Sequence, residues 1–150
     1  MLKLSFEGSN APFYATTFSA GFDFCSTEDI CIESGQWKTI GTGVRILESQ
    51  TQAILSLGET QLAVIPELQI RPRSGLATKF GITILNTPST VDCDYRGEIK
   101  INLINHGTDA FVIKKGDRIA QGVCTLVFQC PGLEVKEKIR AEGGFGSTGV

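Results

Sequence analysis

Histidine is almost absent from this sequence of 150 residues, in which His106 is the only one. Histidine is the commonest general base near neutral pH, so a Ser–His or Cys–His triad would have to run through this residue, which lies in an expected turn. No two of the five cysteines form a C-x-x-C motif, their positions being Cys25, Cys31, Cys93, Cys124 and Cys130. A Cys/His zinc site is therefore not expected. We expect the thiols to be reduced and mostly buried, which suits a cytosolic compartment.

Long hydrophobic runs and an excess of basic charge are also missing. No apolar run approaches the roughly 20 residues that a membrane-spanning helix needs, and residues 1–7 are too short and too mixed for a signal peptide. With 14 Lys and Arg against 16 Asp and Glu, the formal net charge is −2, which argues against a protein that binds duplex nucleic acid. A small anionic ligand is compatible with this charge, because a few local cations and backbone N–H groups can hold phosphate. These absences predict a cytoplasmic protein (in the host cytoplasm if the gene is viral) with no membrane or nucleic-acid partner.

Glycine and short apolar runs dominate what is present. The 17 glycines exceed the typical share and predict many tight turns, or backbone that comes close to a ligand. Runs of strand type recur between turn signals at residues 53–57, 61–65, 82–85, 98–105, 110–113 and 118–128. They favour an all-β sandwich, jelly roll or barrel in a single domain, residues 1–150. The one exception is a helical turn with Ser74 as its expected N-cap.

Two segments carry residues that suit phosphate chemistry. In residues 71–75, two arginines, a serine hydroxyl and the N–H groups of a helix start fall close together, which is typical of a phosphate receptor. A basic turn capped by serine is the alternative. In residues 92–98, Asp92 and Asp94 could orient a water, act as general base or hold a metal. An acidic turn before a strand is the commoner origin of such a pair.

Two other segments are ambiguous when each is taken alone. The Asp–Arg pair of residues 116–121 is usually structural, and Gln121 would usually be a surface residue. Asp23, which follows Gly21 and Phe22, is typical of a turn.

The C-terminal residues 142–149 are rich in glycine and cannot pack a core. Composition alone favours a frayed terminus. The alternative is a mobile arm in which Arg140, Ser147 and Thr148 hold phosphates while Phe145 stacks on a base.

Taken in order, these segments resemble the five motifs of the homotrimeric dUTPase family. The similar segments are residues 20–23, 72–77, 86–98 and 116–121, and Arg140 with residues 143–149. Each segment alone is a weak match, but five in the right order and spacing are strong evidence.

The resemblance implies a distorted jelly-roll or β-barrel-like fold with one short helix and a flexible C-terminal arm at about residues 136–150. It implies a homotrimer in which each active site draws motifs from all three chains. The implied reaction is the hydrolysis of dUTP to dUMP and pyrophosphate, which keeps uracil out of DNA and supplies dUMP for dTMP synthesis. The rival readings are a dCTP deaminase-like enzyme, which would carry a different second motif, and a nucleotide-binding regulatory trimer without turnover.

The resemblance also implies roles for individual residues. Asp92 would activate the water that attacks the α-phosphorus, and Asp23 would contact waters on an Mg²⁺ ion held mainly by the triphosphate. Tyr95 would pack under the deoxyribose and clash with a 2′-OH, while Asn86 would pair with uracil. The other residues implied to bind substrate are Arg73, Ser74, Gly75, Thr90, Val91, Gln121, Arg140, Phe145, Gly146 and Ser147.

Three positions and one insertion depart from the family pattern. Ser89 stands where a glycine is usual, Ala141 replaces a glycine after the tail arginine, and Gly122 takes the place of a larger apolar residue. Residues 48–68 are longer than usual and hold an extra hairpin. We expect a tolerated surface insertion, because longer loops add little closure entropy. The alternative is a docking element for a protein partner.

Overall fold

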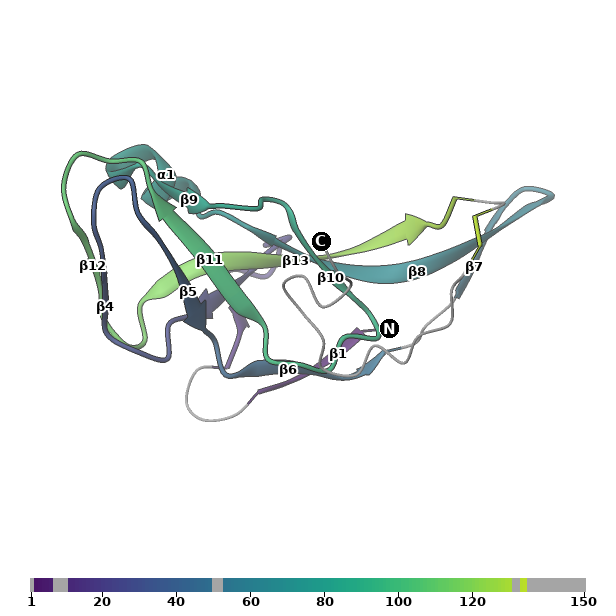
Figure 1. Cartoon of the computed structure of the whole chain (residues 1–150). Coiled ribbons are helices and arrows are strands. Elements are labelled where there is room, and N and C mark those ends of the chain that lie inside the picture. The colour runs from purple at the N-terminus through teal and green to yellow at the C-terminus, as the bar shows by residue number, and fades with distance from the viewer. Residues whose placement is uncertain (1, 7–10, 50–52, 131–132, 135–150) are drawn as a thin grey trace.

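The computed structural model of the protein consists of β-strands and one short helix (Figure 1). It describes residues 2–6, 11–49, 53–130 and 133–134. In chain order the elements are β1 (Leu2–Phe6), β2 (Phe13–Tyr14), β3 (Phe22–Cys25), β4 (Ile30–Ile32), β5 (Trp37–Gly41), β6 (Val44–Ser49), β7 (Ala53–Leu57), β8 (Thr60–Arg71), α1 (Ser74–Phe80), β9 (Ile82–Ile84), β10 (Ser89–Asp92), β11 (Lys100–Asn105), β12 (Phe111–Ile113) and β13 (Arg118–Phe128). The prediction of an all-β fold with one short helix is confirmed. In the described part of the chain, no helix has the length and apolar character needed to cross a membrane.

The largest sheet carries most of the residues of functional interest. Its strand order is β10-β8-β13-β3-β2, and β7 pairs with β8 as a hairpin. β8 and β13 run antiparallel, in register from Gln121 opposite Arg71 to Phe128 opposite Val64. Because directly opposite residues of an antiparallel pair share one face, this register decides which side chains meet.

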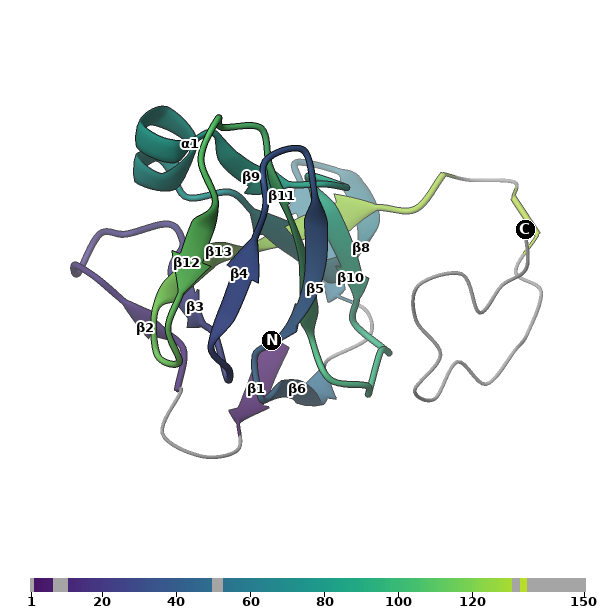
Figure 2. The same ribbon diagram turned by 60° about the vertical axis from the view of Figure 1, so that its left-hand side comes forward.

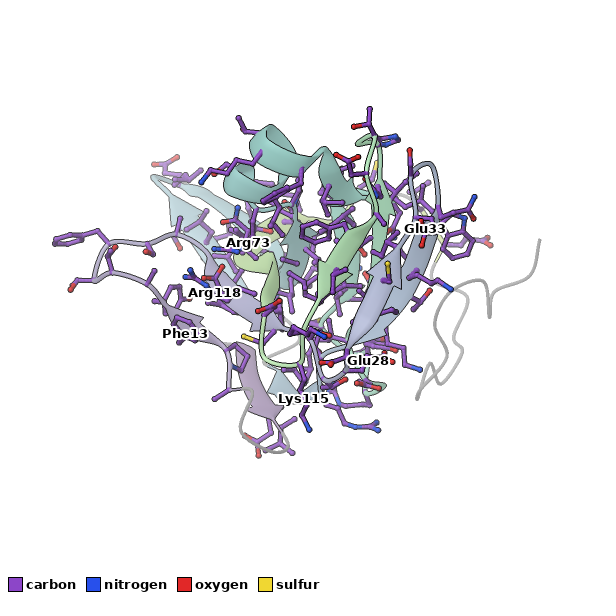
Figure 3. The ribbon with its side chains drawn as sticks, turned by 90° about the vertical axis from the view of Figure 1, so that its left-hand side faces the viewer. Phe13, Glu28, Glu33, Arg73, Lys115 and Arg118 are labelled. Atoms are coloured by element: carbon purple, nitrogen blue, oxygen red, sulfur yellow. The ribbon has the colours of Figure 1, made fainter. Side chains whose placement is uncertain are left out.

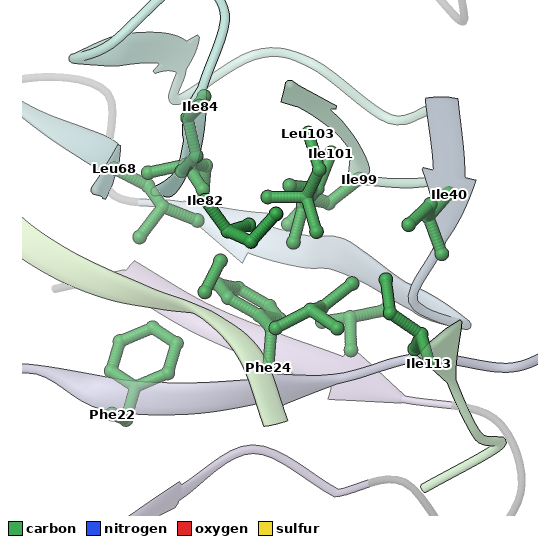
Figure 4. Close-up of a cluster of buried hydrophobic side chains, with 14 of the residues drawn as sticks. Phe22, Phe24, Ile40, Leu68, Ile82, Ile84, Ile99, Ile101, Leu103 and Ile113 are labelled. Carbon is green, nitrogen blue, oxygen red and sulfur yellow. The ribbon is translucent and has the colours of Figure 1, made fainter. Parts of the chain in front are cut away.

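A second layer of short strands covers the inner face of this sheet. β11 lies between β5 and β9, and β12 pairs with β4 (Figure 2). The alternation of β11 sends Ile101 and Leu103 inward. There they pack with Phe24 and Leu68 of the large sheet in one buried cluster (Figure 4). The strands of the described residues form separate open sheets, with no closed barrel among them.

Helix α1 is capped differently from the prediction. The N-cap position is Arg73, whose backbone is extended and which makes no side-chain cap hydrogen bond. Ser74 is already helical, so the prediction of Ser74 as N-cap is wrong. The helix begins one residue earlier because Arg73 is the last extended residue, and its guanidinium binds Asp23. Gly81 ends the helix in the left-handed conformation that glycine adopts without strain.

No disulfide joins cysteines in the described part of the chain, and the prediction that most of the five thiols are buried is wrong. Cys25 and Cys93 are buried, whereas Cys31, Cys124 and Cys130 are exposed. Cys31 is the outward-facing middle residue of β4. Cys124 and Cys130 lie at and beyond the second half of β13, where the large sheet extends past the core.

The predicted hairpin is confirmed, and its return strand runs directly into the large sheet. β7 and the start of β8 project past the core and are joined by a turn at Gly58, whose φ is 62° (Figure 1). Ile54 and Leu57 on β7 are 67% and 58% exposed. From Val64 onward β8 pairs with β13. Residues 48–68 therefore include both a projecting hairpin and part of a core strand.

Candidate active site

Three charged side chains from separate parts of the chain meet at the α1 end of the large sheet. Arg73 Nε lies 3.1 Å from Asp23 Oδ1, and Arg118 Nη1 lies 3.1 Å from Asp23 Oδ2. The Asp23 side chain is only 13% exposed, so the two guanidinium groups offset the cost of burying its charge. Arg73 Nη1 also donates to the Arg118 carbonyl at 2.9 Å. Figure 3 shows both arginines on the same side of the molecule, and the group keeps a net positive charge.

A β-bulge brings Arg118 to this group. The register between β13 and β3 shifts between Arg118 and Ala120, which leaves Ile119 as an extra residue. Such a bulge re-aims the side chain beside it. Here the guanidinium of Arg118 reaches Asp23 while Ile119 is buried.

Gln121 adds an amide to the same face of the sheet. It lies opposite Asp23 in β3 and opposite Arg71 in β8. Its Nε2 donates to the carbonyl of Pro72 at 2.9 Å. A Cβ at Gly21 would come within 2.7 Å of Gln121 Oε1, so glycine at that position leaves room for the amide.

Ser74 and Gly75 complete the group at the exposed start of α1. The N–H groups of Leu76 and Ala77 donate to the Arg73 carbonyl. The N–H groups of Ser74 and Gly75 precede them at the start of the helix, where N–H groups have no intrahelical partner. A Cβ added at Gly75 would meet no atom within 4 Å, so the space in front of it is open. The structure thus brings together the residues of the first, second and fourth segments. We call them the cationic cluster: Asp23, Arg73, Ser74, Gly75, Arg118 and Gln121.

The residues of the third segment lie on and after β10. Asp92 ends the strand, and in the turn that follows Tyr95 N–H donates to the Asp92 carbonyl at 3.1 Å. The Tyr95 hydroxyl donates to the Glu98 carbonyl at 3.0 Å. A Cβ at Gly97 would come within 2.6 Å of Tyr95 Cζ, so this glycine lets the ring lie against the backbone. The turn therefore fixes the position of Tyr95.

The pairing of β10 with β8 is regular despite the unusual serine before Asp92. Ser89 lies in β10 opposite Ile70, and its Oγ accepts a hydrogen bond from Asn86 Nδ2 at 3.2 Å. Thr90 is exposed, and Val91 packs partly on the core. We call Asn86, Thr90, Val91, Asp92 and Tyr95 the β10 cluster.

The two clusters do not meet within one chain. Gln121 pairs with Arg71 of β8, whereas Asp92 pairs with Glu67 of β8. Glu67 and Arg71 are four residues apart on that strand. At about 3.3 Å per residue this separation is roughly 13 Å along the strand. β10 and β13 also flank β8 on opposite sides, which adds roughly 10 Å across the sheet. Within one chain, the cationic cluster and Asp92 at the end of β10 are therefore far apart.

Burial raises the pKa of the Cys25 thiol, and the neighbouring Asp23 carboxylate raises it further, against the opposing effect of Arg118 and Arg73. The thiol is protonated near neutral pH and is a poor nucleophile. Covalent catalysis by Cys25 is therefore not expected, although the residue lies next to the cationic cluster.

The predicted tail residues Arg140, Phe145, Gly146 and Ser147 lie outside the described residues, and their roles stay predictions. Within the described residues, no group of three His, Cys, Asp or Glu side chains could hold a metal ion.

Two residues beside these clusters were missed at the level of sequence. The sequence pattern alone favours a structural pair of Asp117 and Arg118, whereas the contact of Arg118 with Asp23 depends on the bulge in β13. Glu67 lies opposite Asp92 and is only 9% exposed. A charged residue between Pro66 and Leu68 in a largely apolar strand was the signal that could have indicated it.

The fold and the cationic cluster define a small all-β protein with a positively charged group of side chains at the α1 end of its main sheet. The chain belongs to the dUTPase family, whose family model matches residues 8–149. It is 50% identical over 141 residues to a deoxyuridine 5'-triphosphate nucleotidohydrolase of Nautilia profundicola, an alignment that covers 92% of this chain and 89% of the relative.

Solved structures share this fold at lower identity. The dUTPase of Staphylococcus bacteriophage 80alpha with dUPNHPP is 23% identical, with a TM-score of 0.70 over 100% of this chain and 99% of that one. A dUTPase mutant from phage phi11 of S. aureus is 21% identical, with a TM-score of 0.67 over 91% and 97% of the two chains. That phage protein coordinates a structural Mg(II) ion.

Proposed function

We propose that this chain hydrolyses dUTP to dUMP and pyrophosphate as a homotrimer whose active sites are shared between subunits. The separation of the two clusters carries this proposal. The reaction needs a general base beside the α-phosphorus and cations beside the same phosphates. Asp92 and Arg73 lie too far apart in one chain to serve one phosphate, so a second copy would bring its cationic cluster to the β10 cluster.

Each cluster suits one part of the substrate. Arg73, Ser74, Gly75 and Gln121 would hold the phosphates with charge, hydroxyl, backbone N–H and amide groups. In the β10 cluster, Asn86 with the backbone of Thr90 and Val91 would bind uracil, and Tyr95 would pack under the deoxyribose.

Asp92 would accept the proton of the attacking water. The tail residues Arg140, Phe145, Gly146 and Ser147 would then close over the base and the terminal phosphates.

The donor set fits an Mg²⁺ ion held mainly by its nucleotide. Such an ion needs few protein ligands, because it keeps several waters and takes oxygens from the phosphates. Asp23 is the carboxylate of the cationic cluster and would accept hydrogen bonds from metal-bound water. When bound, the ion would neutralise charge on the triphosphate. A cytoplasmic location is in keeping with the lack of a disulfide among the described cysteines.

The test is pyrophosphate release from dUTP, dTTP, dCTP and UTP with Mg²⁺, with wild type compared to Asp92→Asn. We expect turnover of dUTP alone and a loss of about 10²–10⁴-fold in kcat for Asp92→Asn, with binding of a non-hydrolysable dUTP analogue retained. Ammonia release from dCTP would identify a deaminase instead. Tight binding of dUTP by the wild type with no product would identify a nucleotide-binding regulator.

A further inference from the structure

Glu67 lies at a position where a carboxylate is unfavourable for the sheet. The register of β8 and β10 places it directly opposite Asp92, so the two side chains share one face with Cβ atoms about 5 Å apart. Like charges at such a position destabilise an antiparallel pair. Residues that break a local rule of stability are expected where function requires them.

The carboxylate of Glu67 is also held in one orientation. The residue is only 9% exposed. Gln69 Nε2 donates to Glu67 Oε2 at 3.0 Å, and Thr125 Oγ1 donates to the same oxygen at 3.2 Å. Thr125 is the direct partner of Glu67 on β13, so support comes from both the same strand and its neighbour. A charge fixed in this way acts in a constant direction.

The same contacts continue toward the cationic cluster. Gln69 Oε1 accepts a hydrogen bond from Arg71 Nε at 3.2 Å, while the amide nitrogen of Gln69 donates to Glu67. Arg71 is level with Gln121, and Glu67 is level with Asp92. The hydrogen-bonded side chains of Glu67, Gln69 and Arg71 therefore run along β8 from the position paired with Asp92 to the position paired with Gln121.

We propose that Glu67 is a positioning residue for Asp92. Its fixed negative charge repels the Asp92 carboxylate away from β8, and β10 is the edge strand of the sheet, so this direction leads to the open edge. A second copy of the chain would bring its cationic cluster to that edge. The inference rests on the proposed function, because a general base acts only when it is placed within a few tenths of an ångström of its target geometry.

The test is Glu67→Gln, which keeps the volume and one acceptor oxygen but removes the charge. We expect kcat for dUTP to fall about tenfold, with KM within about twofold of wild type, because substrate binding does not need the orientation of Asp92. The melting temperature should stay equal or rise, because the repulsion across β8 and β10 is gone. Glu59→Gln, in the exposed turn of the hairpin, is the matched control and should change neither quantity.

A second variant separates positioning from structure. Glu67→Asp keeps the charge but shortens the side chain, so it should lower the melting temperature and yet retain more of kcat than Glu67→Gln. A wild-type kcat in Glu67→Gln, or a loss of activity that follows a loss of stability in both variants, would overturn the positioning role. The proposed function would survive that result, whereas failure of the wild type to release pyrophosphate from dUTP would overturn both.

Discussion

Gly122 on β13 lies directly against two aromatic rings of β3. A Cβ at this position would come within 2.7 Å of Phe24 Cε2 and 2.8 Å of Phe22 Cε2. The two rings pack edge to face with centroids 5.3 Å apart, and both are almost fully buried. Because neither ring can move into solvent, the glycine and the two phenylalanines form one packing unit. This unit explains why the chain has glycine where the family pattern has a larger apolar residue.

Gly122→Ala should therefore destabilise the protein. We expect the free energy of unfolding to fall by about 1–3 kcal/mol through overpacking, measured by urea denaturation followed by circular dichroism. Gly75→Ala is the control, because its Cβ would meet no atom within 4 Å. Alanine also favours a helix over glycine, so this variant should be as stable as wild type or more stable. Equal denaturation midpoints for the two variants would contradict the packing argument.

At the scale of elements, Asp29 ties the segment before β4 to the turn before β13. Its Oδ1 accepts a hydrogen bond from Lys115 N–H at 2.8 Å, and its Oδ2 lies 3.3 Å from Lys114 Nζ. These contacts lower the pKa of Asp29, and the backbone hydrogen bond from Lys115 contributes most. A lowered folded-state pKa means that the ionised form stabilises the fold. The stabilisation is present above the unfolded-state pKa and is lost as the pH falls through the folded-state pKa.

Asp29→Asn should lower the melting temperature slightly at pH 7. The effect is small because the residue is exposed. The difference from wild type should shrink below about pH 3.8, the ordinary pKa of the group, and vanish at lower pH. Thermal melts at pH 7, 4 and 2.5 measure it, with Glu59→Gln as control. A difference that is the same at every pH would show that the charge of Asp29 does not matter.

The hairpin of β7 and β8 can be shortened at a defined register. Ala53 and Val64 are direct partners, so residues 54–63 can be replaced by an Asn-Gly turn without shifting β8. We expect an unchanged kcat and a free energy of unfolding within about 1 kcal/mol of wild type, because the removed residues project past the core. Gel filtration checks assembly. Loss of assembly or of turnover would indicate that the hairpin contacts another chain.

The strands from β7 onward were largely predictable because their signals are local, whereas β1 to β6 and β10 were not predicted. The alternation of residues 100–105 and the run 118–128 identify β11 and β13 without any knowledge of the fold. The position of Glu67 opposite Asp92 was not predictable, because it depends on the register between strands that are distant in sequence.

Two errors have the same non-local origin. The cap of α1 depends on the contact of Arg73 with Asp23, which lies on another strand. The exposure of Cys124 depends on where the core ends beneath β13. Asp23, Arg73 and Gln121 were each identified from the sequence, and the structure brings all three together.

At the scale of the whole molecule, the arrangement of the two clusters favours a ring of identical chains. A head-to-tail contact that joins the β10 cluster of one chain to the cationic cluster of the next uses different surfaces on the two partners. Such a contact closes into a ring when the rotation fits, and a threefold ring then contains three equivalent sites. Within it, Asp92 and Arg73 of any one chain would serve different sites.

This arrangement predicts that two inactive variants restore each other. Arg73→Ala should fold, because Arg118 still pairs with Asp23, and it should be inactive alone, as should Asp92→Asn. In trimers assembled at random from equal amounts of both variants, a site is intact when an Arg73→Ala chain supplies its Asp92 and an Asp92→Asn chain supplies its Arg73. That combination has a probability of about one quarter, so co-refolded protein should recover about one quarter of wild-type pyrophosphate release from dUTP. Activity no higher than the sum of the two separate variants would mean that each site lies within a single chain, and the shared-site trimer would then be wrong.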